Sequence, residues 1–514
     1  MNSRVEVVSM RFPVCLIIAL WIVSGMCLGQ GHTPNIVIIL ADDLGYGDPG
    51  CYNDQSLIPT PNIDDLANQG MKFSDAHSPS SVCTPTRYGL LTGRYCWRTR
   101  LKRSVLWPWD PPLLESDRLT LPEMFRQKGY TTACVGKWHL GWDWPLQNGQ
   151  YLTDKFSGVT LPAQKREVLA QQIDFSRPTR GGPTDHGFQS YFGDDVPNFP
   201  PYAFIEDRKT IGIPTVSKPA SMFGNPGPAL PAWDLSIVMP TITQQAVQLI
   251  EGHQADDPPF FLFMPLTAPH TPIAPSSHFI GKSKAGWYGD YVHQVDWTLG
   301  QIQTALRRND LTNDTLLIFT SDNGSPQRNG ENMNGPTGSV KKLGHDPSRP
   351  WRGMKSDAWE GGHRVPFIAA WPGHILANST SQQPIILTDL MRTLARLLDF
   401  ELDAETAEDS FDIGATLFTK ASDLNSSPIR DHLIHHSGNG LFAIREGAWK
   451  LILGKNSGGF TRFNPPADAP AGQLYNLRND PSESNNLYEQ NPEVVQQLTQ
   501  RLNHLKNSGR SFDQ

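Results

Sequence analysis

Two acidic pairs directly follow short apolar runs, and their oxygen atoms suit a hard metal ion. Asn35–Ala41 (NIVIILA) precedes Asp42-Asp43, and Thr315–Thr320 (TLLIFT) precedes Ser321 and then Asp322-Asn323. Both runs are typical of buried parallel strands, and ligands of open α/β folds lie at the carboxyl ends of such strands. One acidic pair alone would indicate a turn or a helix cap, whereas two pairs at two strand ends predict a site for Ca²⁺ or Mg²⁺. The predicted ligands are Asp42, Asp43, Asp322 and Asn323.

A cysteine and an arginine one helical turn apart form the next candidate. They are the ends of Cys83–Arg87 (CTPTR), which is followed by Leu91–Arg94 (LTGR). A cysteine that begins a helix gains from the helix dipole, and Arg87 could face the same anion. The short pattern by itself would also fit a buried structural cysteine.

The elements that must position these residues alternate between strands and helices. Phe260–Met264 (FFLFM) is a third buried apolar run. Pro61–Asn68 and Thr120–Lys128 are predicted helices, with Thr60 and Thr120 as their caps, and Trp287–Arg308 is a long amphipathic helix. Alternating strands and helices predict an α/β sheet with helices on both faces.

The pattern changes near residue 430. Leu441–Arg445 and Trp449–Leu453 flank Glu446-Gly447 and predict a hairpin, and a helix is predicted to begin at Asn491-Pro492. We therefore expect a catalytic domain over residues 30–428 and an α+β subdomain over residues 429–514. Leu474–Leu477 could add a strand to the subdomain.

The N-terminal segment predicts export. Arg4 and Arg11 precede the apolar run Phe12–Leu28, so residues 1–29 are interpreted as a signal peptide. An uncleaved membrane anchor is the alternative, although the run is just short of a comfortable span. The formal net charge of −7 over 514 residues argues against binding nucleic acid through phosphate contacts.

Six elements in chain order resemble the formylglycine-dependent type I sulfatases of the alkaline phosphatase superfamily. They are Asn35–Asp43, Cys83–Arg87 with Leu91–Arg94, Gly136–Gly141 (GKWHLG), Ala268–Pro272 (APHTP), Ser321–Gly324 (SDNG), and Arg352–Lys355 (RGMK) with Trp359–Pro366 (WEGGHRVP). The resemblance covers nearly the whole chain after residue 29. It implies a large, mostly parallel mixed sheet flanked by helices, a small C-terminal antiparallel sheet with a helix, and an arylsulfatase-like sulfuric ester hydrolase.

The resemblance implies that a separate maturation enzyme converts Cys83 to formylglycine. A serine-type nucleophile would leave a sulfated enzyme that is hard to hydrolyse, whereas a hydrated aldehyde has two hydroxyls on one carbon. One hydroxyl attacks sulfur, and the other loses its proton so that the carbonyl re-forms and sulfate leaves. If Cys83 is used in this way, at most one disulfide can form among Cys51, Cys96 and Cys134, and the pairing stays open.

The resemblance also assigns roles residue by residue. The cation would be Ca²⁺ rather than Mg²⁺. The modified Cys83 would bind it together with the four predicted metal ligands. Arg87 would anchor the hydrated aldehyde, and His139 would accept the proton of its second hydroxyl. Lys137 and Lys355 would hold the sulfate oxygens, and His270 would act as general acid on the leaving oxygen. His363 occupies a variable motif position and would either contact the substrate or simply pack.

A sulfated carbohydrate is the expected substrate, although an unspecified small sulfate ester is the broader class. Two alternatives remain: a phosphate or phosphonate ester hydrolase of the same superfamily, and a catalytically silent binding protein. The intact candidate residues argue against the silent protein. The insertion Tyr191–Phe204 could line a substrate pocket or pack as an ordinary loop; its polar residues are Asp194, Asp195, Asn198 and Tyr202. The sequence does not indicate the oligomeric state.

Overall fold

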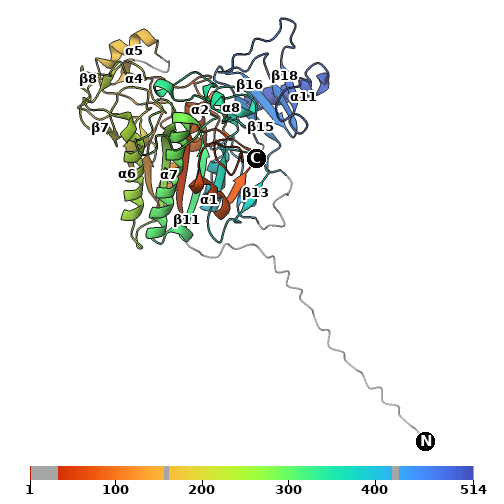
Figure 1. Ribbon diagram of the computed structural model, residues 1–514. Coiled ribbons are helices and arrows are strands. Elements are labelled where there is room, and N and C mark those ends of the chain that lie inside the picture. The colour runs from red at the N-terminus through yellow and green to blue at the C-terminus, as the bar shows by residue number, and fades with distance from the viewer. Residues whose placement is uncertain (2–32, 156–160, 420–427, 513–514) are drawn as a thin grey trace. The chain divides into compact units, whose positions relative to one another are not determined.

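The computed structural model describes Met1 and residues 33–155, 161–419 and 428–512 (Figure 1). The predicted signal peptide, apart from Met1, lies outside the described residues. Residues Pro34–Gln514 form one compact unit. Within the described ranges, no helix has both the length and the apolar character needed to cross a bilayer.

A large mixed sheet forms the centre of this unit. Its inner strands are parallel and run in the order β11 (Thr315–Ser321), β1 (Asn35–Asp42), β10 (Phe260–Pro269), β4 (Thr131–Val135) and β5 (Ser190–Gly193). β12 (Phe367–Ala370) pairs antiparallel with β11. Beyond β12 lie β2 (Met71–Phe73) and β13 (Ser379–Ser381), and beyond β5 lie β6 (Ile205–Glu206) and β7 (Lys209–Thr210). The predicted α/β fold class is confirmed.

Strand β1 explains why its sequence is a continuous apolar run. Ile36, Ile38 and Leu40 pack into the core on one face of the sheet, and Val37 and Ile39 pack into the core on the other. All five side chains are fully buried. Because successive side chains of a strand point to opposite faces, a central strand covered on both sides must be apolar at every position.

Helices cover both faces of the sheet. On one face, α1 (Pro61–Gln69), α6 (Val238–Gly252) and α7 (Gly286–Arg308) share a core with β1 and β10 (Figure 1). On the other face, α2 (Cys83–Thr92), α3 (Leu121–Gln127) and α9 (Asp389–Leu397) contribute to the second core. The three helices predicted with both bounds, Pro61–Asn68, Thr120–Lys128 and Trp287–Arg308, are present as α1, α3 and α7, with ends within two residues of those expected.

The two predicted threonine caps behave differently. Thr120 caps α3, because its Oγ1 accepts a hydrogen bond from the Glu123 N–H at 3.4 Å. Thr60 does not cap α1; its Oγ1 accepts from the Gly50 N–H at 2.8 Å instead. Asp296 of α7 takes over the cap and accepts from the backbone N–H groups at the start of α1. A tertiary contact has therefore replaced the local one.

A small antiparallel sheet lies near the C-terminus, as expected. Its strands are β15 (His432–His436), β16 (Phe442–Glu446), β17 (Trp449–Ile452) and β18 (Gln473–Asn476), in that order. β16 and β17 form the predicted hairpin, and α11 (Pro492–Asn507) packs on the sheet through Leu498, Leu502 and Leu505. The proposed domain boundary at residues 428–429 stays a prediction.

Short elements complete the described chain. They are β3 (Ala76–His77), α4 (Leu152–Lys155), α5 (Ala163–Ala170), β8 (Val216–Ser217), β9 (Pro228–Ala229), α8 (Glu360–His363), β14 (Ile385–Ile386) and α10 (Gly414–Leu417).

A buried ionic network joins the small sheet to α8. The ammonium of Lys450 in β17 lies 2.9 Å from a carboxylate oxygen of Glu360 and 2.9 Å from one of Glu483. The three side chains are excluded from solvent. Charges in such a place must be paired, because none of them is hydrated.

Replacing Lys450 with Met should destabilise the protein, because the buried Glu483 would lose the ammonium that pairs with it. Glu360 would lose the same ammonium and keep Arg364, at 2.7 Å, as its cationic partner. Removing one partner of a buried ion pair costs about 3–5 kcal/mol, so the Tm should fall by several degrees. Thermal unfolding followed by circular dichroism measures this. The exposed Lys455 provides a matched control, since Lys455→Met makes the same charge change at the surface. Equal Tm values for the two variants would contradict the assignment.

Candidate active site

The register of the central strands brings the two acidic pairs together. β1 and β11 are parallel, with Leu40 opposite Thr320 and Ala41 opposite Ser321. Asp42-Asp43 and Asp322-Asn323 therefore leave the sheet side by side at its carboxyl edge, and the Asp43 N–H donates to Asp322 Oδ1 at 3.2 Å. Asp43 has a left-handed backbone, with φ of 67°, which is uncommon outside glycine and concentrates at functional sites.

Three cations pair with the three carboxylates. Lys137 Nζ lies 2.7 Å from Asp42 Oδ2, Lys355 Nζ lies 2.5 Å from Asp43 Oδ1, and Arg87 Nη2 lies 2.8 Å from Asp322 Oδ2. Lys137 lies in the loop after β4, Lys355 lies in the loop before α8, and Arg87 lies in α2. All six side chains are buried. We call these six residues the charge cluster.

Cys83 is the first residue of α2 and lies against the charge cluster. Its Sγ is 3.5 Å from Asp42 Oδ1 and 3.4 Å from Lys355 Nζ, and the residue is 1 % exposed. Burial, together with the negative charge of Asp322, raises the pKa of the Cys83 thiol well above its usual range. The unmodified side chain is therefore a thiol rather than an activated thiolate.

The two predicted histidines have defined hydrogen bonds. A backbone carbonyl only accepts, so His139 donates from Nε2 to Leu106 O at 3.0 Å, and His270 donates from Nδ1 to Thr271 O at 2.5 Å. Burial and nearby positive charge, from Lys137 at His139 and Lys355 at His270, lower the pKa of both imidazoles well below the usual value. Each neutral ring then has one unprotonated nitrogen: Nδ1 of His139 and Nε2 of His270.

The donor set fits a divalent cation. The Oδ1 atom of Asn323 is buried and has no hydrogen-bond partner in the described part of the chain, while its Nδ2 donates to Asp43 Oδ1 at 2.7 Å. Ligand atoms of Asp42, Asp43, Cys83 and His270 all lie within 4.8 Å of one another. Carboxylate and amide oxygens of this kind are ligands for Ca²⁺ and Mg²⁺.

A cavity of about 370 Å³ gives access to these groups. Cys83, Asp43, His139, His270 and Lys355 are among the residues that line it. The lining also includes aromatic and polar side chains that the motifs did not indicate: Trp107, Phe199, Phe223, Arg328, Asn334 and Phe460. Such residues come from loops, where no periodic pattern marks them. Arg328 could have been noticed, because it follows Asp322 by only six residues.

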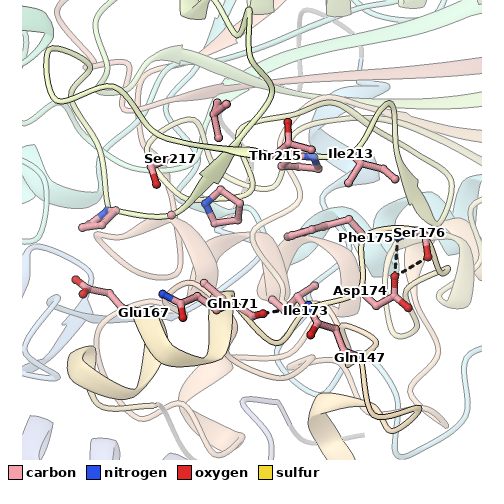
Figure 2. A pocket seen from close by; sticks show the side chains of 16 residues that line it. Gln147, Glu167, Gln171, Ile173, Asp174, Phe175, Ser176, Ile213, Thr215 and Ser217 are labelled. Atoms are coloured by element: carbon pink, nitrogen blue, oxygen red, sulfur yellow. Dashed lines mark hydrogen bonds between the residues drawn. The ribbon is translucent and has the colours of Figure 1, made fainter.

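A second cavity, of about 560 Å³, lies elsewhere and has a different character (Figure 2). Glu167 and Asp174 are the charged side chains among its lining residues, and Gln147 and Gln171 add neutral amides. Figure 2 shows Asp174 hydrogen-bonded to Ser176 within the lining. A cavity whose charges are negative repels an anionic ester, so the candidate active site is the smaller cavity.

The structure does not bring His363 into the site. His363 is fully buried and is not among the residues that line the smaller cavity. Its Nδ1 lies 3.0 Å from Nδ1 of His77, its Nε2 lies 3.1 Å from Lys450 Nζ, and its ring stacks on His435 at 3.8 Å between centroids. Of the two roles considered from sequence, these contacts support packing rather than contact with a substrate.

The Tyr191–Phe204 insertion contributes to the site in part. Asp195 accepts a hydrogen bond from the His139 N–H at 3.1 Å, and Asn198 lines the cavity. Asp194 and Tyr202 are buried within the fold. Cys51, Cys96 and Cys134 are free thiols in the structure, so the disulfide that the sequence left open is not formed there.

Comparisons with known proteins agree on one family. The family model called Sulfatase matches residues 34–400. An N-acetylgalactosamine-6-O-sulfatase of Bacteroides thetaiotaomicron is 33% identical, over 93% of this chain and 94% of that protein. Human arylsulfatase A is 32% identical, over 96% and 90%. A solved structure from work on glycosaminoglycan metabolism by Bacteroides thetaiotaomicron superposes with a TM-score of 0.75 at 30% identity, covering 93% of this chain and 100% of that one.

Unmodified Cys83 should react slowly with iodoacetamide in the folded protein at pH 7.5, because the thiol is buried beside Asp42 and Asp322 and thiolate is the reactive form. Peptide mass spectrometry should find Cys83 largely unlabelled before unfolding and fully labelled in guanidinium chloride. The fully buried Cys134 provides an internal comparison. Rapid labelling of Cys83 alone, in the folded state, would show that it is an activated thiolate.

Proposed function

This chain belongs to the sulfatase family and hydrolyses sulfate esters, and on that premise we propose that it removes sulfate from a sulfated carbohydrate through a formylglycine at position 83. The observation that carries the proposal is the position of Cys83. It lies at the start of α2, in contact with Asp42 and Lys355, and lines the cavity. The carbohydrate substrate is supported by the relatives that are N-acetylgalactosamine-6-sulfatases.

A hydrated formylglycine supplies two hydroxyls on one carbon, one to attack sulfur and one whose ionisation releases sulfate. His139 is suited to the second event. Its Nδ1 is buried, unprotonated in the neutral ring and without a hydrogen-bond partner in the described chain. It can therefore accept a proton with no competing donor. Asp195 holds the His139 backbone, and the Leu106 carbonyl fixes the ring.

His270 is placed to protonate the leaving oxygen. Its Nδ1 is held by Thr271 O, so Nε2 is the atom that exchanges a proton with the substrate. Nε2 is 3.8 Å from Asp43 Oδ2. His270 must first take up a proton, and the negative charge of a bound sulfate ester favours that uptake.

Lys137 and Lys355 would bind the sulfate oxygens. Their ammonium groups now contact Asp42 and Asp43, at 2.7 and 2.5 Å. Lys355 also contacts Cys83 Sγ at 3.4 Å, so it stands next to the attacking atom. Arg87 donates hydrogen bonds to Asp322 Oδ2 and to the Lys137 carbonyl, and these bonds fix the positions of both residues in the site.

Asp42, Asp43, Asp322 and Asn323 would hold Ca²⁺ together with the modified Cys83. A divalent cation in this position would polarise the sulfate and favour ionisation of the attacking hydroxyl. The Asn323 Oδ1 atom, which has no hydrogen-bond partner among the described residues, and the closeness of Asp42 and Asp322 support the assignment. Burial, and then the charge of Asp42, raises the pKa of Asp322.

The proposal also includes a maturation enzyme as a partner, and a location. A maturation enzyme must oxidise Cys83 before the fold buries it, since the residue is 1 % exposed in the folded chain. The basic and apolar N-terminal segment supports export. Export would also bring the enzyme into contact with sulfated glycans outside the cytoplasm.

Mass spectrometry of the peptide bearing Cys83 tests the nucleophile. With an active maturation enzyme, we expect a mass about 18 Da below that of cysteine, because an aldehyde oxygen replaces sulfur and two hydrogens are lost. The converted protein should release sulfate from N-acetylgalactosamine 6-sulfate and from 4-nitrophenyl sulfate. Faster turnover of 4-nitrophenyl phosphate than of either sulfate would favour the phosphate ester hydrolase instead. A Cys83→Ala variant is the control.

Asp322→Ala should abolish cation-dependent activity and lower the Tm while the chain still folds, because Arg87 loses its 2.8 Å partner but keeps Asp42 at 3.6 Å. The wild-type Tm should rise with added Ca²⁺ after treatment with a chelator, and that rise should be absent in the variant, because a ligand that binds only the folded state raises its stability. Thermal unfolding with and without Ca²⁺ measures this independently of catalysis. Turnover like that of the wild type in Asp322→Ala would contradict the assignment of Asp322 as a metal ligand.

A further inference from the structure

One cation of the active-site cavity, Arg328, lies outside the charge cluster, and among the described residues the negative charge of Asp43 acts on it only from beyond ion-pair distance. Within the cluster, each carboxylate has its own lysine or arginine. Arg328 also lines the cavity, but no carboxylate of the described residues lies within 4.0 Å of its guanidinium. Its Nη1 donates to the Gly335 carbonyl, and most of its five N–H donors have no partner among the residues that the structure describes.

The loop that carries Arg328 is ordered by its own hydrogen bonds. Nη1 of Arg328 spans the loop to Gly335, and Met333 N donates to Gly330 O at 2.9 Å. The Asn329 N–H donates to Ser339 Oγ at 3.0 Å. The guanidinium is therefore positioned before any substrate arrives, and little side-chain entropy remains to be lost on binding.

Neutral groups around Arg328 match a sugar. Oδ1 of Asn198 and Oδ1 of Asn334 are buried and lack a hydrogen-bond partner in the described structure, and both residues line the cavity. They can accept from hydroxyl or amide N–H groups. Trp107 stacks on Phe199 at 5.7 Å between ring centroids, which provides an apolar surface at the same wall.

A sugar with only hydroxyl groups would satisfy the asparagines but would leave Arg328 partly desolvated and unpaired. The planar fork of a guanidinium matches the paired oxygens of a carboxylate or sulfate. We propose that the substrate carries a second oxyanion, a carboxylate or another sulfate, on the sugar that is left behind, and that Arg328 binds it. This inference rests on the proposed function.

The first test uses the wild-type protein with verified formylglycine. N-acetylgalactosamine 4,6-disulfate is compared with the 6-sulfate, and a uronate-containing 6-sulfated disaccharide is compared with its methyl ester. At least one doubly charged substrate should have a kcat/KM on the order of tenfold or more above its singly charged partner, as expected for a hydrogen-bonded charge pair. The favoured pair identifies the anion as sulfate or carboxylate.

The second test uses variants. Arg328→Gln should reduce the preference for the doubly charged substrate on the order of tenfold, mainly through KM, and Arg328→Lys should retain part of it. Arg308→Gln makes the same charge change on α7, where the side chain is 71% exposed, and should leave the preference unaltered. Tm values establish that each variant is folded.

The outcomes separate the two proposals. Equal kcat/KM values for singly and doubly charged sulfate esters would overturn the role of Arg328 and leave the sulfatase proposal standing. A preference that persists in both Arg328 variants would do the same. Failure to release sulfate from any of these carbohydrates would overturn the proposed substrate class and this inference with it.

Discussion

Every buried charge at the carboxyl edge of the central sheet must be matched by an opposite charge, and this requirement dictates which segments of the chain converge there. Asp42, Asp43 and Asp322 leave adjacent parallel strands, so three carboxylates meet away from water. An isolated buried carboxylate is too costly to keep ionised, and each therefore needs a cation within contact distance. The cations come from α2, from the loop after β4 and from the loop before α8. Segments more than 250 residues apart in the sequence must converge for the charges to balance, and the cavity forms where they meet.

The same constraint explains how the C-terminal sheet is attached. His77 donates from Nε2 to Asp75, and its Nδ1 accepts from Nδ1 of His363, whose Nε2 accepts from Lys450. This order is the one in which two neutral imidazoles satisfy both a carboxylate and an ammonium. His363 is therefore part of a chain of hydrogen bonds that ends at Lys450 in β17. It is close to Lys355 in sequence because α8 begins shortly after Lys355, and this closeness does not bring its side chain into the cavity.

The groups proposed for catalysis and those proposed for substrate recognition come from different parts of the fold. The groups that would bind sulfate lie on strand ends and on the first turn of α2, where the fold leaves little freedom. The groups that would bind the sugar lie on loops that carry Trp107, Asn198, Arg328 and Asn334. Loops tolerate substitution more readily than central strands do. This division is consistent with the similar identities, 33% and 32%, of two relatives named for different substrates, an N-acetylgalactosamine-6-O-sulfatase and arylsulfatase A.

The fold class, the central strands, the main helices, the position of Cys83 and most of the charge cluster could be predicted from the sequence. These features follow local rules, because a buried strand is apolar throughout and short motifs keep polar side chains at fixed spacing. Three features could be seen only in the folded chain: Asp296 caps α1, His363 joins the buried network, and Arg328 lines the cavity with no carboxylate of the described residues at ion-pair distance. Each of these depends on which distant side chain lies within about 3 Å, the range of a hydrogen bond, and no local pattern encodes that distance.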